Sequence, residues 1–189
     1  MSANASVIKG GLFDLSPAQR VAGILIANLL LILSAKIQIP FWPVPMTMQT
    51  FAVLMIGAAL GARDGAAAIA LYLFEGALGF AVFANSPERG IGLAYMYGPT
   101  GGYLMGFLVA ALAVGFASGK GWMKSLTGNV VWMLAGHAIM FALGIAWLSH
   151  LIGFNAALAA GLYPFWLATA LKTAMAVAAY EALRRRYAA

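Results

Sequence analysis

The sequence contains no cysteine, which excludes disulfide bonds, thiol catalysis and zinc sites built from thiolates. Charged residues are scarce as well. They make up only 8% of the 189 residues, whereas 63% are hydrophobic and the mean hydropathy is +0.91. The surface of a soluble domain of this size needs more polar residues than these. The composition therefore predicts an integral membrane protein.

Several sequence motifs are missing too. No Gly-x-x-x-x-Gly-Lys-Ser/Thr loop is present, so this chain is not expected to hydrolyse ATP. We find no catalytic Ser–His–Asp arrangement, no cluster of metal ligands and no basic surface interleaved with aromatics that would bind nucleic acid. The sequence thus predicts neither a metal nor a cofactor.

Three runs lack Asp, Glu, Lys and Arg altogether, at residues 37–62, 90–119 and 125–171. Because a membrane-spanning helix needs about 20 predominantly apolar residues, these runs leave room for several spans. With the prolines and glycines as breaks, the sequence predicts an all-α membrane protein with six transmembrane helices, at 18–39, 46–62, 65–84, 98–118, 126–149 and 160–183.

The helix boundaries have local signals. Ser16 and Pro17 have the residue types of an N-cap and a first helical position. Prolines at 40, 43 and 45 predict a rigid, non-helical connection to the second helix. Residues 84–103 form the one long stretch that we expect to be non-helical, rich in the glycine, proline and tyrosine typical of a binding loop.

The basic residues predict the orientation. With six spans, one side carries eight of them (Lys9, Arg20, Arg63, Lys120, Lys124 and Arg184–Arg186), and the other carries only Lys36 and Arg89. The positive-inside rule then places both termini in the cytoplasm. The net charge of +6 is this orientation signal. We expect a cytoplasmic segment at 1–17, a membrane domain at 18–183 and a basic cytoplasmic tail at 184–189.

Lys172 is isolated within an otherwise apolar helix that continues to Tyr180. At about 1.5 Å of rise per residue, it lies roughly 16 Å from Gly161 and roughly 18 Å from Arg184, near the middle of a hydrocarbon core about 30 Å thick. A cation there costs at least about 2.5 kcal/mol, so it persists only where it faces a partner, a cavity or a solute. Lys172 is therefore a candidate for a functional site.

Glu75 and His137 are the other ionisable residues expected near that depth. Lys172 and Glu75 would form a buried ion pair in one reading, and Lys172 would bind a polar group of a solute in another. A third reading is a proton relay through His137, whose imidazole titrates near neutral pH. For His137 itself, a packed histidine with one hydrogen bond is the simpler expectation.

Other polar and aromatic residues are candidates to complete a site. Thr169 lies three residues before Lys172, on the same helical face. Asn85 and Gln49 carry amides near the outer edge, where capping is the alternative role. Six aromatic residues also fall on the outer side, as a binding wall or as an interfacial belt: Trp42, Tyr95, Tyr97, Tyr103, Tyr163 and Trp166.

Small residues at a spacing of four predict close contacts between helices. Glycines are paired in this way at 57 and 61, 102 and 106, and 115 and 119, and the first helix presents Gly23, Ala27 and Ala35 along one face. Packing within the bundle is the simplest explanation of each pair.

Four segments together resemble one family: residues 44–65 (VPMTMQTFAVLMIGAALGARDG), 72–84 (YLFEGALGFAVFA), 98–107 (GPTGGYLMGF) and 164–176 (PFWLATALKTAMA). They are similar to BioY, the biotin-specific substrate-binding (S) component of energy-coupling-factor (ECF) transporters. The resemblance covers roughly residues 18–183. It implies a six-helix membrane bundle with a solute pocket that opens outward, and no enzymatic activity.

The resemblance also implies site residues. The family's pattern near the last helix reads Pro-Phe-x-x-x-Asp-x-x-Lys; Pro164, Phe165 and Lys172 match it, and Thr169 takes the aspartate position. Glu75 is the candidate to replace that carboxylate. Asn85 belongs to the loop that contributes polar contacts in the family. The expected biotin site is therefore Asn85, Thr169, Lys172, Tyr97, Trp42, Gln49 and Glu75.

The implied partners are biotin, a separate transmembrane coupling subunit, two ATPase subunits and the lipid bilayer. S-components of this type use small residues of the first helix to dock, which implicates Gly23, Ala27 and Ala35. The implied location is the bacterial cytoplasmic (inner) membrane, as a multi-pass protein. Two other functions compete with this one: a self-sufficient carrier of a small solute, and a small intramembrane enzyme that uses His137 and Glu75 as acid and base.

Overall fold

The computed structural model describes residues 15–39 and 42–187. Lys9 and Pro40, the first 14 residues of the expected N-terminal segment and the last two of the basic tail lie outside this range. The described chain is mainly helical, with one short two-stranded sheet and several turns. In order, its elements are α1 (Pro17–Lys36), β1 (Gln38–Ile39), β2 (Met46–Thr47), α2 (Gln49–Ala77), α3 (Gly92–Met96), α4 (Gly101–Gly119), α5 (Leu126–Ile152), α6 (Phe154–Gly161), the 3-10 helix η1 (Tyr163–Phe165) and α7 (Trp166–Tyr187).

The start of α1 confirms the expected N-cap. The Ser16 hydroxyl accepts a hydrogen bond from the Gln19 backbone N–H at 3.4 Å, and the Gln19 side chain accepts one from the Ser16 N–H at 2.9 Å. This reciprocal pair satisfies two donors that would otherwise lack partners at a helix terminus. Pro17 occupies the first helical position, where its missing N–H has no consequence.

Helix α2 is bent sharply at Gly61, which has a φ of 81° and a ψ of 175°. A side chain is strained at this φ, so glycine is required there. An alanine-sized Cβ on Gly65 would lie 3.1 Å from the Gly57 Cα. In a straight helix, residues eight apart are separated by about 12 Å. The chain therefore folds back at Gly61, and the two arms of α2 replace the helices expected at 46–62 and 65–84.

Five helical segments of the described chain are long and apolar enough to cross a membrane: Pro17–Lys36, Gln49–Ala77, Gly101–Gly119, Leu126–Ile152 and Phe154–Tyr187. Six spans were expected, and the difference lies in α2, whose two arms join at Gly61 and count as one helix. The second arm ends at Ala77 rather than at residue 84, and α6, which the sequence did not predict, precedes the last long helix.

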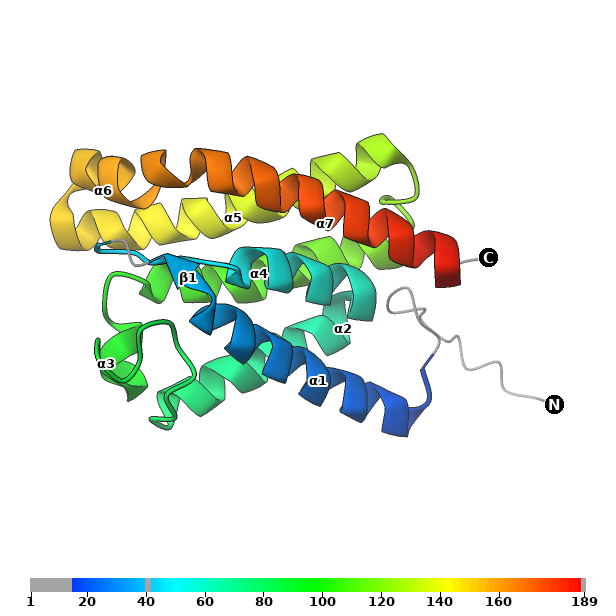
Figure 1. Ribbon diagram of the computed structural model, residues 1–189, viewed down its shortest axis with the longest axis horizontal. Helices are drawn as coiled ribbons and strands as arrows, with labels where there is room; N and C mark the ends of the chain where they lie inside the picture. Colours follow the sequence, from blue (N-terminus) through cyan, green and yellow to red (C-terminus); the bar gives the residue numbers. More distant parts are fainter. Residues whose placement is uncertain (1–14, 40–41, 188–189) are drawn as a thin grey trace.

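The long helices run roughly along one axis of the molecule (Figure 1). One end of the molecule holds the start of α1, the bend of α2, the α4–α5 connection and the end of α7. We call it the basic end because these segments carry Arg20, Arg63, Lys120, Lys124 and Arg184–Arg186. Lys36 and Arg89 lie toward the opposite end. Arg20 and Asp64 join α1 to the bend of α2 through two hydrogen bonds of 2.7 and 2.8 Å.

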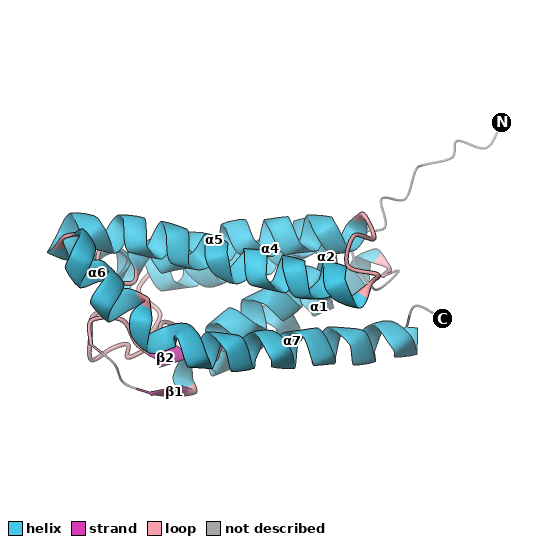
Figure 2. Ribbon diagram, turned by 90° about the horizontal axis from the view of Figure 1, so that it is seen from above, coloured by secondary structure: helices cyan, strands magenta, loops and turns pink. Residues whose placement is uncertain are grey.

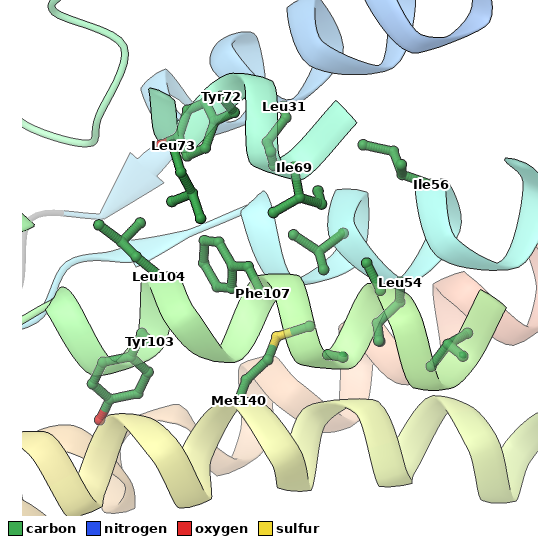
Figure 3. Packing of buried hydrophobic residues seen from close by; sticks show 14 of the residues in the cluster. Leu31, Leu54, Ile56, Ile69, Tyr72, Leu73, Tyr103, Leu104, Phe107 and Met140 are labelled. Carbon is green, nitrogen blue, oxygen red and sulfur yellow. The ribbon is translucent and has the colours of Figure 1, made fainter. Parts of the chain in front are cut away.

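Helix α4 is central and packs between α2 and α5. Figure 3 shows Leu104 and Phe107 of α4 facing Ile69 and Leu73 of the second arm of α2, with Met140 of α5 on the other side. Small residues allow this close packing: a Cβ on Gly57 would lie 2.7 Å from the Ala111 carbonyl oxygen, and one on Gly115 would overlap the Ala62 backbone nitrogen. The glycines expected to bring helices together at 57 and 115 do so within the chain.

The end opposite the basic end is closed by two irregular segments. The β1–β2 hairpin follows α1, with Gln38 paired to Thr47 and Ile39 to Met46, and it lies beside the first turns of α7 (Figure 2). Residues 78–91 form turns, and Asn85 of this segment bonds to Gln38 of the hairpin. The Lys36 ammonium fixes them by donating to the carbonyls of Ala81 and Phe83, both at 2.9 Å, and of Ser86 at 3.2 Å.

A Gly115→Ala variant should be less stable by about 1–3 kcal/mol, because the added methyl group meets the backbone of α2, which cannot rotate away. The matched control is Gly23→Ala, where the nearest atom would be Leu60 Cδ2 at an ordinary 3.6 Å. There the better helix propensity of alanine should leave the stability equal or slightly higher. Thermal unfolding in detergent measures both variants, and equal melting temperatures would contradict the close approach of α4 to α2.

Candidate ligand-binding site

A narrow cavity lies between the hairpin, the first arm of α2, α4, α5 and the start of α7. The cavity has a volume of about 50 Å³, which is room for a few water molecules. Most of the wall is apolar, and the polar groups are few, as is typical of small-molecule sites. The lining residues are Val44, Pro45, Thr47, Gln49, Thr50, Ala84, Tyr95, Thr100, Tyr103, Leu104, Phe107, Met140, Phe141, Phe165 and Lys172.

Lys172 supplies the only lysine or arginine side chain among these lining residues. It is 6% exposed and donates to the Thr47 carbonyl oxygen at 3.1 Å, which joins α7 to the hairpin. An ammonium group has three donors, and this bond occupies one of them. The ammonium is therefore held at the cavity wall with capacity to bind an acceptor on a ligand.

Polar side chains at the start of α2 complete one wall. The Gln49 amide donates to the Tyr72 hydroxyl at 2.7 Å, and the Thr47 hydroxyl donates to Gln49 Oε1 at 3.4 Å. The Thr50 hydroxyl is buried and has no hydrogen-bond partner within the described chain. Because a buried hydroxyl without a partner is costly, Thr50 is a further candidate to bind a polar group in the cavity.

Tyr95 and Tyr103 form walls rather than free polar contacts. Tyr95 stacks on Phe83 at a centroid separation of 4.7 Å, and its hydroxyl donates to the Ala84 carbonyl at 2.7 Å. Burial raises the pKa of Tyr95, so this hydroxyl keeps its proton. The Tyr103 hydroxyl donates to the Gly161 carbonyl at 2.8 Å. Both rings therefore present mainly carbon to the cavity.

His137 is buried near Lys172 and forms hydrogen bonds through one ring nitrogen. Its Nδ1 lies 3.2 Å from the Met133 carbonyl oxygen and 3.1 Å from the Thr173 hydroxyl, which itself donates to the Thr169 carbonyl at 2.8 Å. The Met133 carbonyl can only accept, so Nδ1 carries the proton. Nε2 is then an acceptor, and the described residues offer it no donor.

Two of the seven expected binding residues, Gln49 and Lys172, line the cavity. Asn85 is adjacent to the lining residue Ala84, but its carbonyl oxygen accepts from the Gln38 amide at 2.6 Å. Asn85 also has a φ of 54°, a conformation that asparagine tolerates better than most residues. Asn85 thus fixes the turn through its side-chain oxygen, while its side-chain nitrogen Nδ2 is buried without a partner in the described chain, so its role in binding stays a prediction. The Thr169 hydroxyl is buried without a partner in the described chain, outside the lining.

The six outer aromatic residues separate into two groups. Tyr95 and Tyr103 are buried at the cavity, whereas Trp42, Tyr97, Tyr163 and Trp166 are exposed, as expected of an interfacial belt. Trp42 is 75% exposed and has the Arg89 guanidinium 4.9 Å from its ring centroid. Tyr97 is 69% exposed and lies 6.5 Å from the Trp147 ring. Neither Trp42 nor Tyr97 reaches the cavity lining.

Glu75 and Lys172, which one interpretation of the sequence joins in a buried ion pair, have different partners in the structure. Glu75 lies on the second arm of α2 and accepts from the Asn28 amide of α1 at 3.2 Å. Lys172 bonds to Thr47 instead, and the two ion pairs found between described residues are Arg20–Asp64 and Arg184–Glu181. Their positions along the helices predict similar depths in the membrane for Glu75 and Lys172, but not whether the two side chains face each other.

Two of the three residues expected to form a docking face on α1 are buried within the chain. Ala27 is 5% exposed and Ala35 is fully buried, because both belong to the packed side of α1. Gly23 is half-buried, with Leu60 of α2 nearby. The small residues of α1 thus serve packing within the chain, and the opposite side of α1 presents large apolar residues such as Leu25 and Leu29.

Sequence reasoning missed Thr47, Thr50 and Thr100 as lining residues. All three lie in the segments 44–65 and 98–107 that carry the family resemblance, so those motifs held the signal. Ala84 ends the segment 72–84 of the same resemblance, whereas Met140 and Phe141 had no such signal. For metals, no group of three or more His, Cys, Asp or Glu residues is found across residues 15–39 and 42–187.

The geometry is that of a helical protein with helices long and apolar enough to cross a membrane and a mostly apolar cavity between them. The chain belongs to the BioY family, whose model matches residues 4–189. It is 37% identical over 150 residues to a probable biotin transporter BioY of Pyrococcus horikoshii, covering 79% of this chain and 86% of the relative. It is 38% identical over 164 residues to the biotin transporter BioY of Thermotoga maritima, covering 86% and 92%.

The fold matches a solved structure as well. The crystal structure of the S-component for biotin from an ECF-type ABC transporter superposes with a TM-score of 0.76. That match covers 90% of this chain and 95% of the other, at 24% identity. This neighbour therefore shares the bundle architecture described above.

A double-mutant cycle should find no coupling between Lys172 and Glu75. The stability changes of Lys172→Met and Glu75→Gln should add within about 0.5 kcal/mol, because the two side chains have different partners. The cycle is measured by thermal unfolding of both single variants and the double variant. Rescue of Lys172→Met by Glu75→Gln would instead reveal an ion pair.

Replacing Ala27 by Trp should lower stability by more than about 1 kcal/mol, because a large ring is forced into the α1–α2 contact. The matched control is Ala22→Trp on the exposed side of the same helix, where the melting temperature should stay unchanged. If Ala27→Trp melts normally but no longer binds a transmembrane coupling subunit, Ala27 belongs to the docking face that the sequence predicts.

Proposed function

We propose that this protein is the biotin-binding S-component of an ECF-type vitamin uptake transporter. The observation that carries the proposal is the apolar cavity with Lys172 and Thr50 at its wall in a chain of the BioY family. Relatives in that family are named biotin transporters, and the matched solved structure is named an S-component for biotin. These names favour a transporter over an intramembrane enzyme.

The cavity chemistry suits biotin. The ureido ring has a carbonyl acceptor, which the Lys172 ammonium and the Thr50 hydroxyl can bind from two sides. The thioether ring and the aliphatic chain fit apolar walls such as Phe107, Met140 and Phe141. Because Gln49 is already hydrogen-bonded to Tyr72, we assign it a positioning role. The cavity is narrow, so a vitamin-sized ligand requires side chains or the hairpin to move.

The transport cycle needs partners. The sequence lacks an ATP-hydrolysing motif, so a separate transmembrane coupling subunit and two ATPase subunits would supply the energy. Seven described basic residues at one end, against two toward the other, support a cytoplasmic basic end, six membrane crossings and an outward-opening cavity. We place the chain in the bacterial cytoplasmic (inner) membrane as a multi-pass protein.

The alternative enzyme would need His137 and Glu75 as an acid–base pair. His137 bonds to Met133 and Thr173, while Glu75 bonds to Asn28 of α1, so the two have separate surroundings. A self-sufficient carrier has the same cavity and differs only in needing no ATPase. Uptake by liposomes that contain the purified chain alone distinguishes the two transporters: accumulation without the ATPase module would favour the carrier.

Isothermal titration of the purified protein should give biotin binding tighter than millimolar, without ATP or metal. Lys172→Met should weaken it about 10- to 150-fold through loss of a charged hydrogen bond, and Thr50→Val about 2- to 12-fold through loss of a neutral one. Glu75→Gln, outside the lining, is the matched control and should bind normally. Absent binding or turnover of biotin by the wild type would overturn the proposal.

A further inference from the structure

A second hollow lies on the outer face of the bundle, between α5 and α7. We call it the α5/α7 groove. Leu126, Val130 and Leu134 form one side, and Ala170, Ala174 and Ala178 form a ridge of small residues on the other. Ala174 and Ala178 are exposed, so no part of the described chain covers the ridge. The groove is separate from the biotin cavity, with which it shares no lining residue.

The length of the groove matches one leaflet of a bilayer. Its α7 side extends from Ala170 to Glu181, which is about 16 Å at 1.5 Å per residue. Half of a hydrocarbon core about 30 Å thick is about 15 Å. Its Glu181 side is in the last turns of α7, whose C-terminal end lies at the basic end of the molecule (Figure 1), and Ala170 is about three turns earlier in the same helix. An extended acyl chain of a single leaflet has this reach.

The groove ends in positive charge. Arg184 and Arg185 lie three and four residues after Glu181, so they continue the groove face of α7. Arg186 lies on another side of the helix, with its guanidinium 5.6 Å from the centre of the Tyr187 ring. Glu181 accepts from Arg184 at 2.6 Å and from the Asn129 amide at 3.1 Å, so the charges of Glu181 and Arg184 offset each other and Arg185 leaves this end with a net positive charge. The Arg184 Nε is buried and has no partner in the described chain.

We propose that the α5/α7 groove binds one anionic phospholipid, with an acyl chain against the alanine ridge and the phosphate at Arg184 and Arg185. The charge at one end and the apolar path of one leaflet beyond it match the two chemical parts of such a lipid. A helix of a partner protein could also fill the apolar part of the groove. It would neutralise the arginines only if it carried an acidic residue at the same depth. The lipid satisfies both parts without further assumptions.

The site would act on α7, the helix that carries Lys172. Helix α7 contacts α5 beside the groove through the Asn129 amide, which also donates to the Val177 carbonyl at 3.2 Å. A lipid chain that fills the groove adds contacts between α5 and α7 along the same interface. Anionic lipid should therefore raise the melting temperature, whereas zwitterionic lipid should not.

The test uses purified full-length protein in detergent, titrated with phosphatidylglycerol or phosphatidylcholine and observed by native mass spectrometry and thermal unfolding. We expect one retained phosphatidylglycerol and a higher melting temperature. Arg185→Gln should weaken retention about 5-fold, and Arg184→Gln with Arg185→Gln about 30-fold, at about 1 kcal/mol per cation. Ala174→Trp should abolish retention by filling the groove.

Two matched controls locate the effect. Arg186→Gln removes the same charge on another side of α7, and Ala182→Trp adds the same ring to an exposed position outside the groove lining. Both should retain lipid as the wild type does, and biotin binding by every variant reports correct folding. Equal retention of the two lipids, or equal losses for Arg185→Gln and Arg186→Gln, would overturn the site. Unchanged retention in Ala174→Trp would also overturn it, since the lipid would then lie elsewhere.

Discussion

Lys172 is 6% exposed inside a bundle of mainly apolar side chains, and its ammonium donates to the Thr47 carbonyl 125 residues earlier in the chain. A buried cation requires polar partners, and apolar helices provide few, because their own carbonyls are engaged in the helix. The hairpin supplies one, since Thr47 lies in a two-residue strand just before α2. The bond therefore places the hairpin over α7, and the cavity exists between these two elements.

Much of the fold could be predicted because it depends on local signals. The Ser16–Gln19 capping box, the break near the prolines and the turn at Gly61 each depend on residues close in sequence. The short helix α6 was missed, because Gly153 reads as a simple turn although the helix restarts at once. Glycine spacing correctly identified close contacts at Gly57 and Gly115, since only backbone-to-backbone approach requires the missing side chain.

The site was harder to predict because it depends on which face of a helix meets which neighbour. Glu75 and Lys172 have similar depth along their helices, yet Glu75 faces Asn28 of α1. In the same way Ala27 and Ala35 have the spacing of a docking face, but that face is turned inward against α2. A periodic pattern identifies a side of a helix. It does not say whether the neighbour is another helix of the same chain, a lipid or a partner subunit.

The departure at Thr169 has an electrostatic consequence for the cavity. Where the BioY pattern has an aspartate three residues before the lysine, this chain has a neutral hydroxyl, and Glu75 does not replace the missing charge. In the described residues, Lys172 therefore has a backbone carbonyl as its partner and no carboxylate. A carboxylate partner would neutralise the ammonium and compete with a ligand for its donors. Without one, the cavity keeps a positive centre that favours a ligand acceptor of partial or full negative charge, such as a ureido oxygen or a carboxylate.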